Sequence, residues 1–160
     1  MSPPRSPERV LVRLWLPVLG WAALISLFST GWFSNEQTGR VLIPLLQWLF
    51  PSLPPRTLQA IHRGVRKAAH FTEYLVLSWL IHRRLRQEGW RPLSAATAAL
   101  VVSVAYACID ELHQVFIPGR TATWGDVGID SLGAAAGQLL QLAQPYPRAH
   151  SSTPARAQRG

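Results

Sequence analysis

Side chains that can exchange protons or hold an anion are concentrated in three short stretches of the sequence, residues 67–74, 110–114 and 120–130. The candidates are basic, acidic, amide and phenolic residues: Lys67, His70, Glu73, Tyr74, Asp110, Glu111, His113, Gln114, Arg120, Asp126 and Asp130. Histidines and carboxylates serve as general acids and bases, and lysine and arginine neutralise phosphate or carboxylate groups. The set therefore suits binding of an anionic ligand, or chemistry on one.

Helical spacing places most of the candidates on one face of each helix that would carry them. At 100° per residue, the four candidates at 67–74 share an arc of about 120°. Asp110, His113 and Gln114 share a second face, whereas Glu111 falls outside it. We expect these two faces to point toward each other.

The last candidate stretch continues into a small-residue stripe. Asp126, Asp130, Gly133 and Gly137 fall within an arc of about 60° on one helix, so two carboxylates stand above two glycines. Glycines four residues apart let two helices approach closely. This spacing predicts that the carboxylates are drawn against a neighbouring helix.

The elements that must position these residues are predicted to be membrane-spanning helices from their length and apolar composition. Residues 14–33 contain no formal charge, and 20 helical residues span about 30 Å, the thickness of the hydrocarbon layer. A cleaved signal sequence is the alternative for this stretch. The crossings are expected at residues 14–33, 65–81, 93–109 and 126–143. Residues 41–50 are too short for a crossing and predict an interfacial or re-entrant helix. The fold class is thus all-α: a polytopic membrane protein with four transmembrane helices and one short interfacial helix.

The charge distribution supports this topology and excludes a nucleic-acid binder. The net charge is +8, and with the N-terminus inside, ten of the 16 basic residues face the cytoplasm and six face outward. This is the positive-inside pattern. We expect disordered cytoplasmic tails at 1–12 and 144–160, a membrane domain at 13–143, and the candidate residues at the outer face. The single cysteine, Cys108, excludes an internal disulfide and a zinc site built on several cysteines.

Two segments give the sequence a family resemblance. RKAAHFTEYLVLSWL at 66–80 and YACIDELHQVFIPGRTATWGDVGIDSLGAAAGQLL at 106–140 resemble the VanZ-like family of small bacterial membrane proteins. Asp130 departs from the family pattern, which usually has asparagine there. The resemblance implies a cell-envelope protein that acts on phosphate-bearing lipid head groups or lipid-linked cell-wall precursors, and the founding member is associated with teicoplanin resistance.

Two hypotheses about function follow. In an enzyme, Lys67 and Arg120 would neutralise the phosphate charge, and His70 or His113 would be the base that activates a hydroxyl or water. The carboxylates at 110, 111, 126 and 130 could hold a divalent cation. The residues assigned to catalysis are Lys67, His70, Glu73, Asp110, His113 and Asp126, and those assigned to substrate binding are Tyr74, Glu111, Gln114, Arg120 and Asp130. In a non-catalytic binding protein, the same pocket would hold an anionic lipid or the glycopeptide, or the glycine face would dock a partner helix or a second copy of the chain. An interhelical network that only locks the bundle is a third reading. A transporter is disfavoured because the chain lacks two matching halves.

Overall fold

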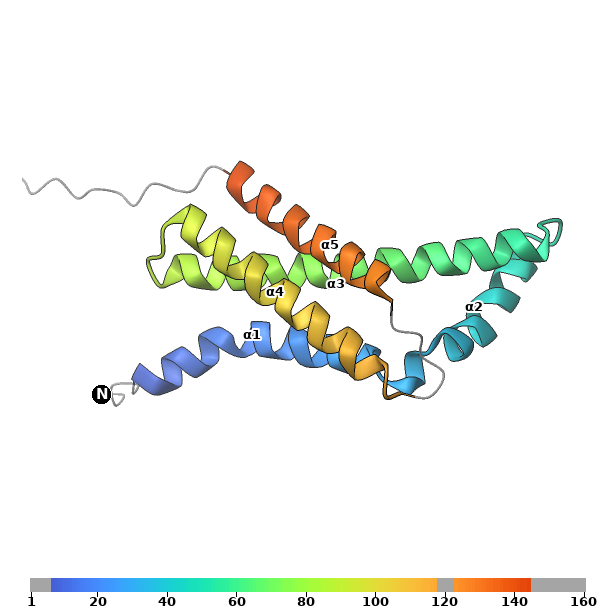
Figure 1. Ribbon diagram of the computed structural model, residues 1–160, viewed down its shortest axis with the longest axis horizontal. Helices are drawn as coiled ribbons and strands as arrows, with labels where there is room; N and C mark the ends of the chain where they lie inside the picture. Colours follow the sequence, from blue (N-terminus) through green and yellow to red (C-terminus); the bar gives the residue numbers. More distant parts are fainter. Residues whose placement is uncertain (1–6, 118–122, 145–160) are drawn as a thin grey trace, which may run out of the picture.

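The computed structural model describes residues 7–117 and 123–144, with side chains from residue 15 onward. Within these ranges the structure is all-helical, as the sequence predicts (Figure 1). The elements are α1 (Pro7–Phe28), the short 3-10 helix η1 (Gly31–Phe33), α2 (Asn35–Leu49), α3 (Pro55–Gln87), α4 (Pro92–Gln114) and α5 (Trp124–Ala143). The tail residues 1–6 and 145–160, and the loop residues 118–122, lie outside the described residues.

Local sequence accounts for several helix ends. The Ser34 hydroxyl accepts a hydrogen bond from the Gln37 N–H at 3.3 Å and caps α2, and the Thr123 hydroxyl accepts one from the Asp126 N–H at 3.2 Å and caps α5. Pro92 stands in the first turn of α4, where a missing N–H costs nothing. Gly89 has φ +89° in the turn between α3 and α4, a conformation that suits glycine.

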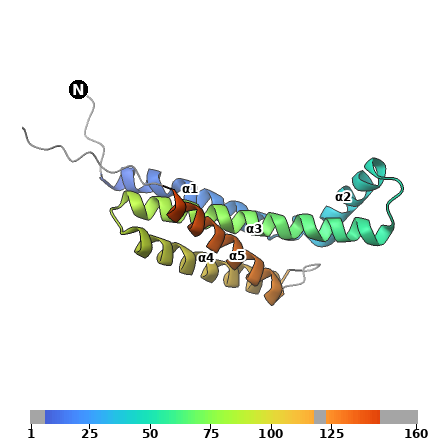
Figure 2. The same ribbon diagram turned by 90° about the horizontal axis from the view of Figure 1, so that it is seen from above.

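α3 is the longest helix, and all other helices lie along it (Figures 1 and 2). α1, α4 and α5 pack on its C-terminal part, and α2 runs beside its N-terminal part, which extends beyond the other helices. The start of α1, the turn between α3 and α4 and the end of α5 lie at one end of the bundle in both views. The end of α4 and the start of α5, which carry the acidic candidates, therefore meet at the opposite end.

The packing of α5 on α3 confirms the predicted glycine contact. A Cβ atom added to Gly133 would lie 2.1 Å from the Phe71 carbonyl oxygen, and one added to Gly137 would lie 2.6 Å from the Leu75 carbonyl oxygen. No side chain fits at these distances, so the two backbones touch directly. The glycine face is therefore covered by α3 of the same chain, and Tyr74 is fully buried beside it.

Only part of the predicted membrane topology is visible in the described helices. α4 is the one helix there that is long and apolar enough to cross a membrane by itself. The stretch predicted as a single crossing at 14–33 is instead interrupted: α1 ends at Phe28, and residues 15–28 pass the same test only together with residues 31–49, from which they are bent by 66°. The 33 residues of α3 include clusters of charge, and α5 is rich in alanine, glycine and glutamine, so neither passes. The four-crossing bundle stays a prediction.

Large apolar side chains nevertheless cover the outer faces of three helices. Residues on α1, α4 and α5 expose about half or more of their surface: Leu16, Leu19, Leu27, Val101, Val102, Ile109, Leu112, Leu132, Leu139 and Leu140. The buried core, by contrast, contains small residues such as Ala99, Ala107 and Ala134. On α4 and α5 the larger side chains thus point outward and small ones pack inward, whereas α1 and α3 supply the large core residues Ile25, Tyr74, Leu77 and Ile81.

Candidate functional site

A cluster of one histidine and two carboxylates lies where α3, α4 and α5 meet. His70 comes from α3, Glu111 from α4 and Asp130 from α5. One potential ligand atom from each lies within 4.8 Å of the other two, and His70 Nδ1 is 3.3 Å from Asp130 Oδ1. Asp130 is fully buried and Glu111 is 5% exposed. We call these three residues the buried triad.

Most of the polar atoms of the buried triad have no hydrogen-bond partner. Both carboxylate oxygens of Asp130, Oε1 of Glu111 and Nδ1 of His70 are buried without one. The remaining Glu111 oxygen, Oε2, accepts a hydrogen bond from the Thr123 N–H at 3.0 Å, which orients this carboxylate from the start of α5. Buried polar atoms are nearly always paired, so the cluster is an unusual feature that calls for a ligand or a proton.

Asp110 belongs to a separate network between α1 and α4. The Ser29 hydroxyl donates a hydrogen bond to Asp110 Oδ2 at 2.6 Å, and the Gln114 amide donates to the same oxygen at 3.1 Å. Ser29 comes directly after α1, so this network fastens the end of α1 to the last turn of α4. Tyr106, one turn earlier, donates from its hydroxyl to the Ala22 carbonyl oxygen at 2.8 Å. Asp110 therefore serves helix attachment in this structure.

A cavity of about 310 Å³ opens beside the buried triad, between the end of α1, η1, α2 and the middle of α3. Its walls combine apolar and polar side chains: Phe28, Ser29, Phe33, Thr38, Leu42, His62, Val65, Arg66, Ala69, His70 and Glu73. His70 belongs to both the cavity and the buried triad. The cavity and the triad are thus adjoining parts of one region.

Hydrogen bonds across the cavity hold two of its polar side chains in place. Arg66 Nη1 donates to the Phe33 carbonyl oxygen at 3.1 Å, and the His62 Nε2 atom lies 3.1 Å from the Thr38 hydroxyl. Both contacts tie α3 to the segment that follows α1.

The position of His62 favours its neutral form. Burial lowers the pKa of His62 below the ordinary value of 6.5, and the positive charges of Arg66 and Arg63 lower it further. A neutral imidazole can accept a proton from a bound group.

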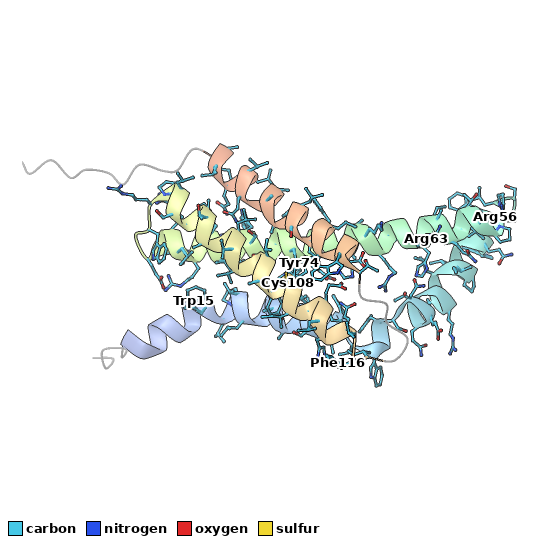
Figure 3. All side chains as sticks on the ribbon, viewed as in Figure 1. Trp15, Arg56, Arg63, Tyr74, Cys108 and Phe116 are labelled. Carbon is cyan, nitrogen blue, oxygen red and sulfur yellow. The ribbon has the colours of Figure 1, made fainter. Side chains whose placement is uncertain are left out.

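Figure 3 shows Arg56 and Arg63 on the extended part of α3 beside α2, while Tyr74 lies where α3 is crossed by α4 and α5.

The structure divides the residues that the sequence places in one cluster. His70 and Asp130 come together, Glu73 lines the cavity and Tyr74 is buried in the core. Lys67 is exposed on α3.

The end of α4 and the start of α5 also differ from the expectation. His113 is exposed, Asp126 is partly exposed, and Gln114 is bound to Asp110. Glu111, expected off the inward face of α4, is buried against α3 and α5, because α4 packs between α1 on one side and α3 and α5 on the other. Arg120 lies outside the described residues.

Sequence reasoning missed the cavity residues Ser29, Thr38, His62 and Arg66. His62, Arg66 and His70 follow one another at four-residue spacing, which is a signal for one shared helical face. Ser29 and Thr38 gave no such signal, because their role depends on the break after Phe28, which an uncharged run of 20 residues conceals.

Comparison with families of known proteins identifies a family for this chain. A family model described as VanZ/LLP1 matches residues 14–143, which include the buried triad and the whole cavity. No curated protein and no solved structure matches the chain.

Proposed function

Because the chain belongs to the VanZ/LLP1 family, we propose that it is a membrane enzyme acting on the phosphate-bearing head group of a lipid or lipid-linked precursor. The observation that carries the proposal is the cavity, which combines an apolar wall with a guanidinium group, two imidazoles and a carboxylate. Its volume lies at the lower end of the range for small-molecule sites, roughly 300–1,000 Å³. A head group with the first carbons of its chains matches that size and polarity.

Each polar side chain of the cavity has a role in this proposal. Arg66 neutralises the phosphate, since a guanidinium group binds phosphate oxygens through paired N–H donors. His62, neutral at physiological pH, accepts the proton of the attacking hydroxyl or water as that oxygen bonds to phosphorus, and returns the proton to the oxygen whose bond to phosphorus breaks. Glu73 orients that nucleophile, and His70 links the cavity to the buried triad. This assignment moves the cation and the base from Lys67 and His113, which are exposed, to the residues of the cavity.

The membrane setting is supported by the surface of the bundle. Lipid tails, unlike water, are a suitable environment for the exposed leucine, valine and isoleucine side chains of α1, α4 and α5. We place α4, α5, the C-terminal part of α3 and α1 across the membrane, with α2 at the interface. The basic residues near the start of α1 and in the turn after α3 then face the cytoplasm, and the cavity lies toward the outer leaflet.

The test compares lipids of the cell envelope with and without the protein. We expect a phosphate-bearing lipid to accumulate in its absence and to return to its normal level with the wild type. Arg66→Gln and His62→Asn should fail to restore it. Arg56→Gln is the matched control, because Arg56 is an exposed arginine on the same helix, outside the cavity.

A second measurement separates an enzyme from a binding protein. The purified chain is mixed with vesicles that contain phosphatidylglycerol or a polyprenyl phosphate, and both binding and product are measured. Turnover by the wild type that His62→Asn abolishes while binding persists supports the enzyme. Binding without product, together with an unchanged envelope lipid composition, would overturn it in favour of a lipid-binding protein of the kind that contributes to glycopeptide resistance.

A further inference from the structure

We infer that the buried triad of His70, Glu111 and Asp130 binds a divalent transition metal ion of the zinc type. The binding itself is independent of the proposed function, and only the ion's part in a reaction rests on it. Three side chains from three helices supply one imidazole nitrogen and two carboxylate oxygens. Three protein ligands with room for a further ligand is the composition of catalytic zinc sites.

The distances within the triad suit one small ion. Zinc bonds to histidine nitrogen and carboxylate oxygen are about 2.0–2.2 Å long, which puts neighbouring ligand atoms roughly 3.4 Å apart in a tetrahedral site. His70 Nδ1 and Asp130 Oδ1 are 3.3 Å apart. All three ligand atoms lie within 4.8 Å of one another, so small rotations of the Glu111 side chain complete the site.

Charge and hydrogen bonding point to a cation rather than to a closed polar network. When both are ionised, two buried carboxylates beside one imidazole carry a net negative charge whether or not the histidine is protonated. Among the described side chains, those of residues 15–117 and 123–144, no lysine or arginine forms an ion pair with Glu111 or Asp130. Both oxygens of the fully buried Asp130 lack any hydrogen-bond partner. Buried carboxylate oxygens that accept no hydrogen bond are costly, and a divalent cation would satisfy those of both residues at once.

The surrounding structure orients one ligand and sets the spacing of two helices before any ion binds. The Thr123 N–H orients the Glu111 carboxylate through Oε2 and leaves Oε1 to face the triad. The contact of Gly133 with the Phe71 carbonyl sets the distance between α3 and α5 next to His70 and Asp130. Such support of metal ligands by neighbouring groups is typical of metal sites. Asp110 lies outside this group of ligand atoms, and its Oδ2 instead accepts hydrogen bonds from Ser29 and Gln114.

The ligand set favours a zinc-type ion over magnesium or calcium. Mg²⁺ and Ca²⁺ prefer sites made of oxygen atoms alone, whereas imidazole suits zinc, iron and nickel. His70 also borders the cavity, so a ligand in the cavity lies next to the ion. The competing explanation is a protonated His70 that forms a plain ion pair with Asp130, and this is an outcome of the test.

The experiment uses the full chain, purified in detergent with a tag that contains no histidine. Bound metal is removed with a chelator, Zn²⁺ is titrated, and metal content and the dissociation constant are measured. We expect about one Zn²⁺ per wild-type chain and at least tenfold weaker binding for His70→Ala, Glu111→Gln and Asp130→Asn. His113→Ala is the matched control, because His113 is an exposed histidine on α4 close to Glu111, and its binding should equal that of the wild type.

Thermal unfolding keeps the result interpretable if one variant is unstable. Zn²⁺ should raise the unfolding temperature of the wild type and of His113→Ala, and should leave that of Asp130→Asn unchanged. Asp130→Asn preserves the shape of the side chain and removes its charge. Wild-type chain without stoichiometric Zn²⁺, or equal Zn²⁺ affinity in the wild type and Asp130→Asn, would overturn the metal site and leave the ion pair. Neither result depends on whether lipid turnover is observed.

Discussion

Replacing Gly133 with alanine should weaken the bundle more than the same change at any other glycine of α5. The new Cβ would lie 2.1 Å from the Phe71 carbonyl oxygen, and ordinary contact begins near 3.4 Å, so α5 must move away by more than 1 Å. The atom in the way is backbone and cannot rotate aside. Overpacking of this kind costs about 1–3 kcal/mol, and we expect the upper half of that range. Gly137→Ala, at 2.6 Å from the Leu75 carbonyl oxygen, should cost less.

The matched control is Gly128→Ala on the same helix. Gly128 is exposed and has no heavy atom within 4 Å of its added Cβ, so the better helix propensity of alanine should stabilise this variant by up to about 1 kcal/mol. Thermal unfolding in detergent measures all three variants. At roughly 2–4 °C per kcal/mol, Gly133→Ala should lower the unfolding temperature by about 4–12 °C. Equal stability of Gly133→Ala and Gly128→Ala would refute the direct backbone contact between α3 and α5.

Two further predictions concern the attachment of α1 and α2. Ser29→Ala removes the hydroxyl that donates to Asp110 Oδ2 at 2.6 Å, and it should lower the free energy of unfolding by about 1–3 kcal/mol, since hydrogen bonds to charged groups are among the stronger ones. Denaturant titration checks this, with the exposed Ser94→Ala on α4 as the control; equal losses in the two variants would contradict the role of Ser29. The second prediction is a pH dependence: the pKa of His62 is lowered in the folded chain, so the unfolded chain binds the extra proton and stability falls as pH drops below about 6.5. His62→Gln should flatten the unfolding temperature between pH 7.5 and pH 5, and an unchanged slope would show that His62 is not the titrating group.

Periodicity and residue type were sufficient to predict the all-helical fold and the contact made by the glycine stripe. The Gly133 and Gly137 spacing identified the face of α5 that meets another helix, because only glycine permits that approach. The break after Phe28 could not be predicted in the same way. Residues 14–33 are uncharged throughout, and hydropathy does not distinguish one straight helix from two helices that bend apart by 66°.

The candidate site was predicted in part, and the error has a specific cause. His70 and Asp130 were expected on inward faces and do meet. Glu111 was placed off the inward face of α4 because a single inward direction was assumed for that helix. α4 instead has partners on two sides. Asp110 accepts a hydrogen bond from Ser29, directly after α1, while Glu111 meets α3 and α5. Which face of a helix is inward depends on how many neighbours it has, and spacing along one chain does not give that number.

The arrangement of polar groups along α3 connects the buried triad to the cavity. Burying a carboxylate is costly unless it is paired and hydrogen-bonded, and the triad holds two carboxylates with one imidazole. If these groups served only to hold helices together, a carboxylate with hydrogen-bond donors would cost less free energy. The chain has that arrangement between α1 and α4, where Ser29 and Gln114 donate to Asp110. Asp130 has no such partner, although Ser131 is adjacent to it on α5. A fully buried carboxylate that contacts the His70 imidazole but accepts no hydrogen bond in the described part of the chain is therefore better explained by what it binds than by what it stabilises.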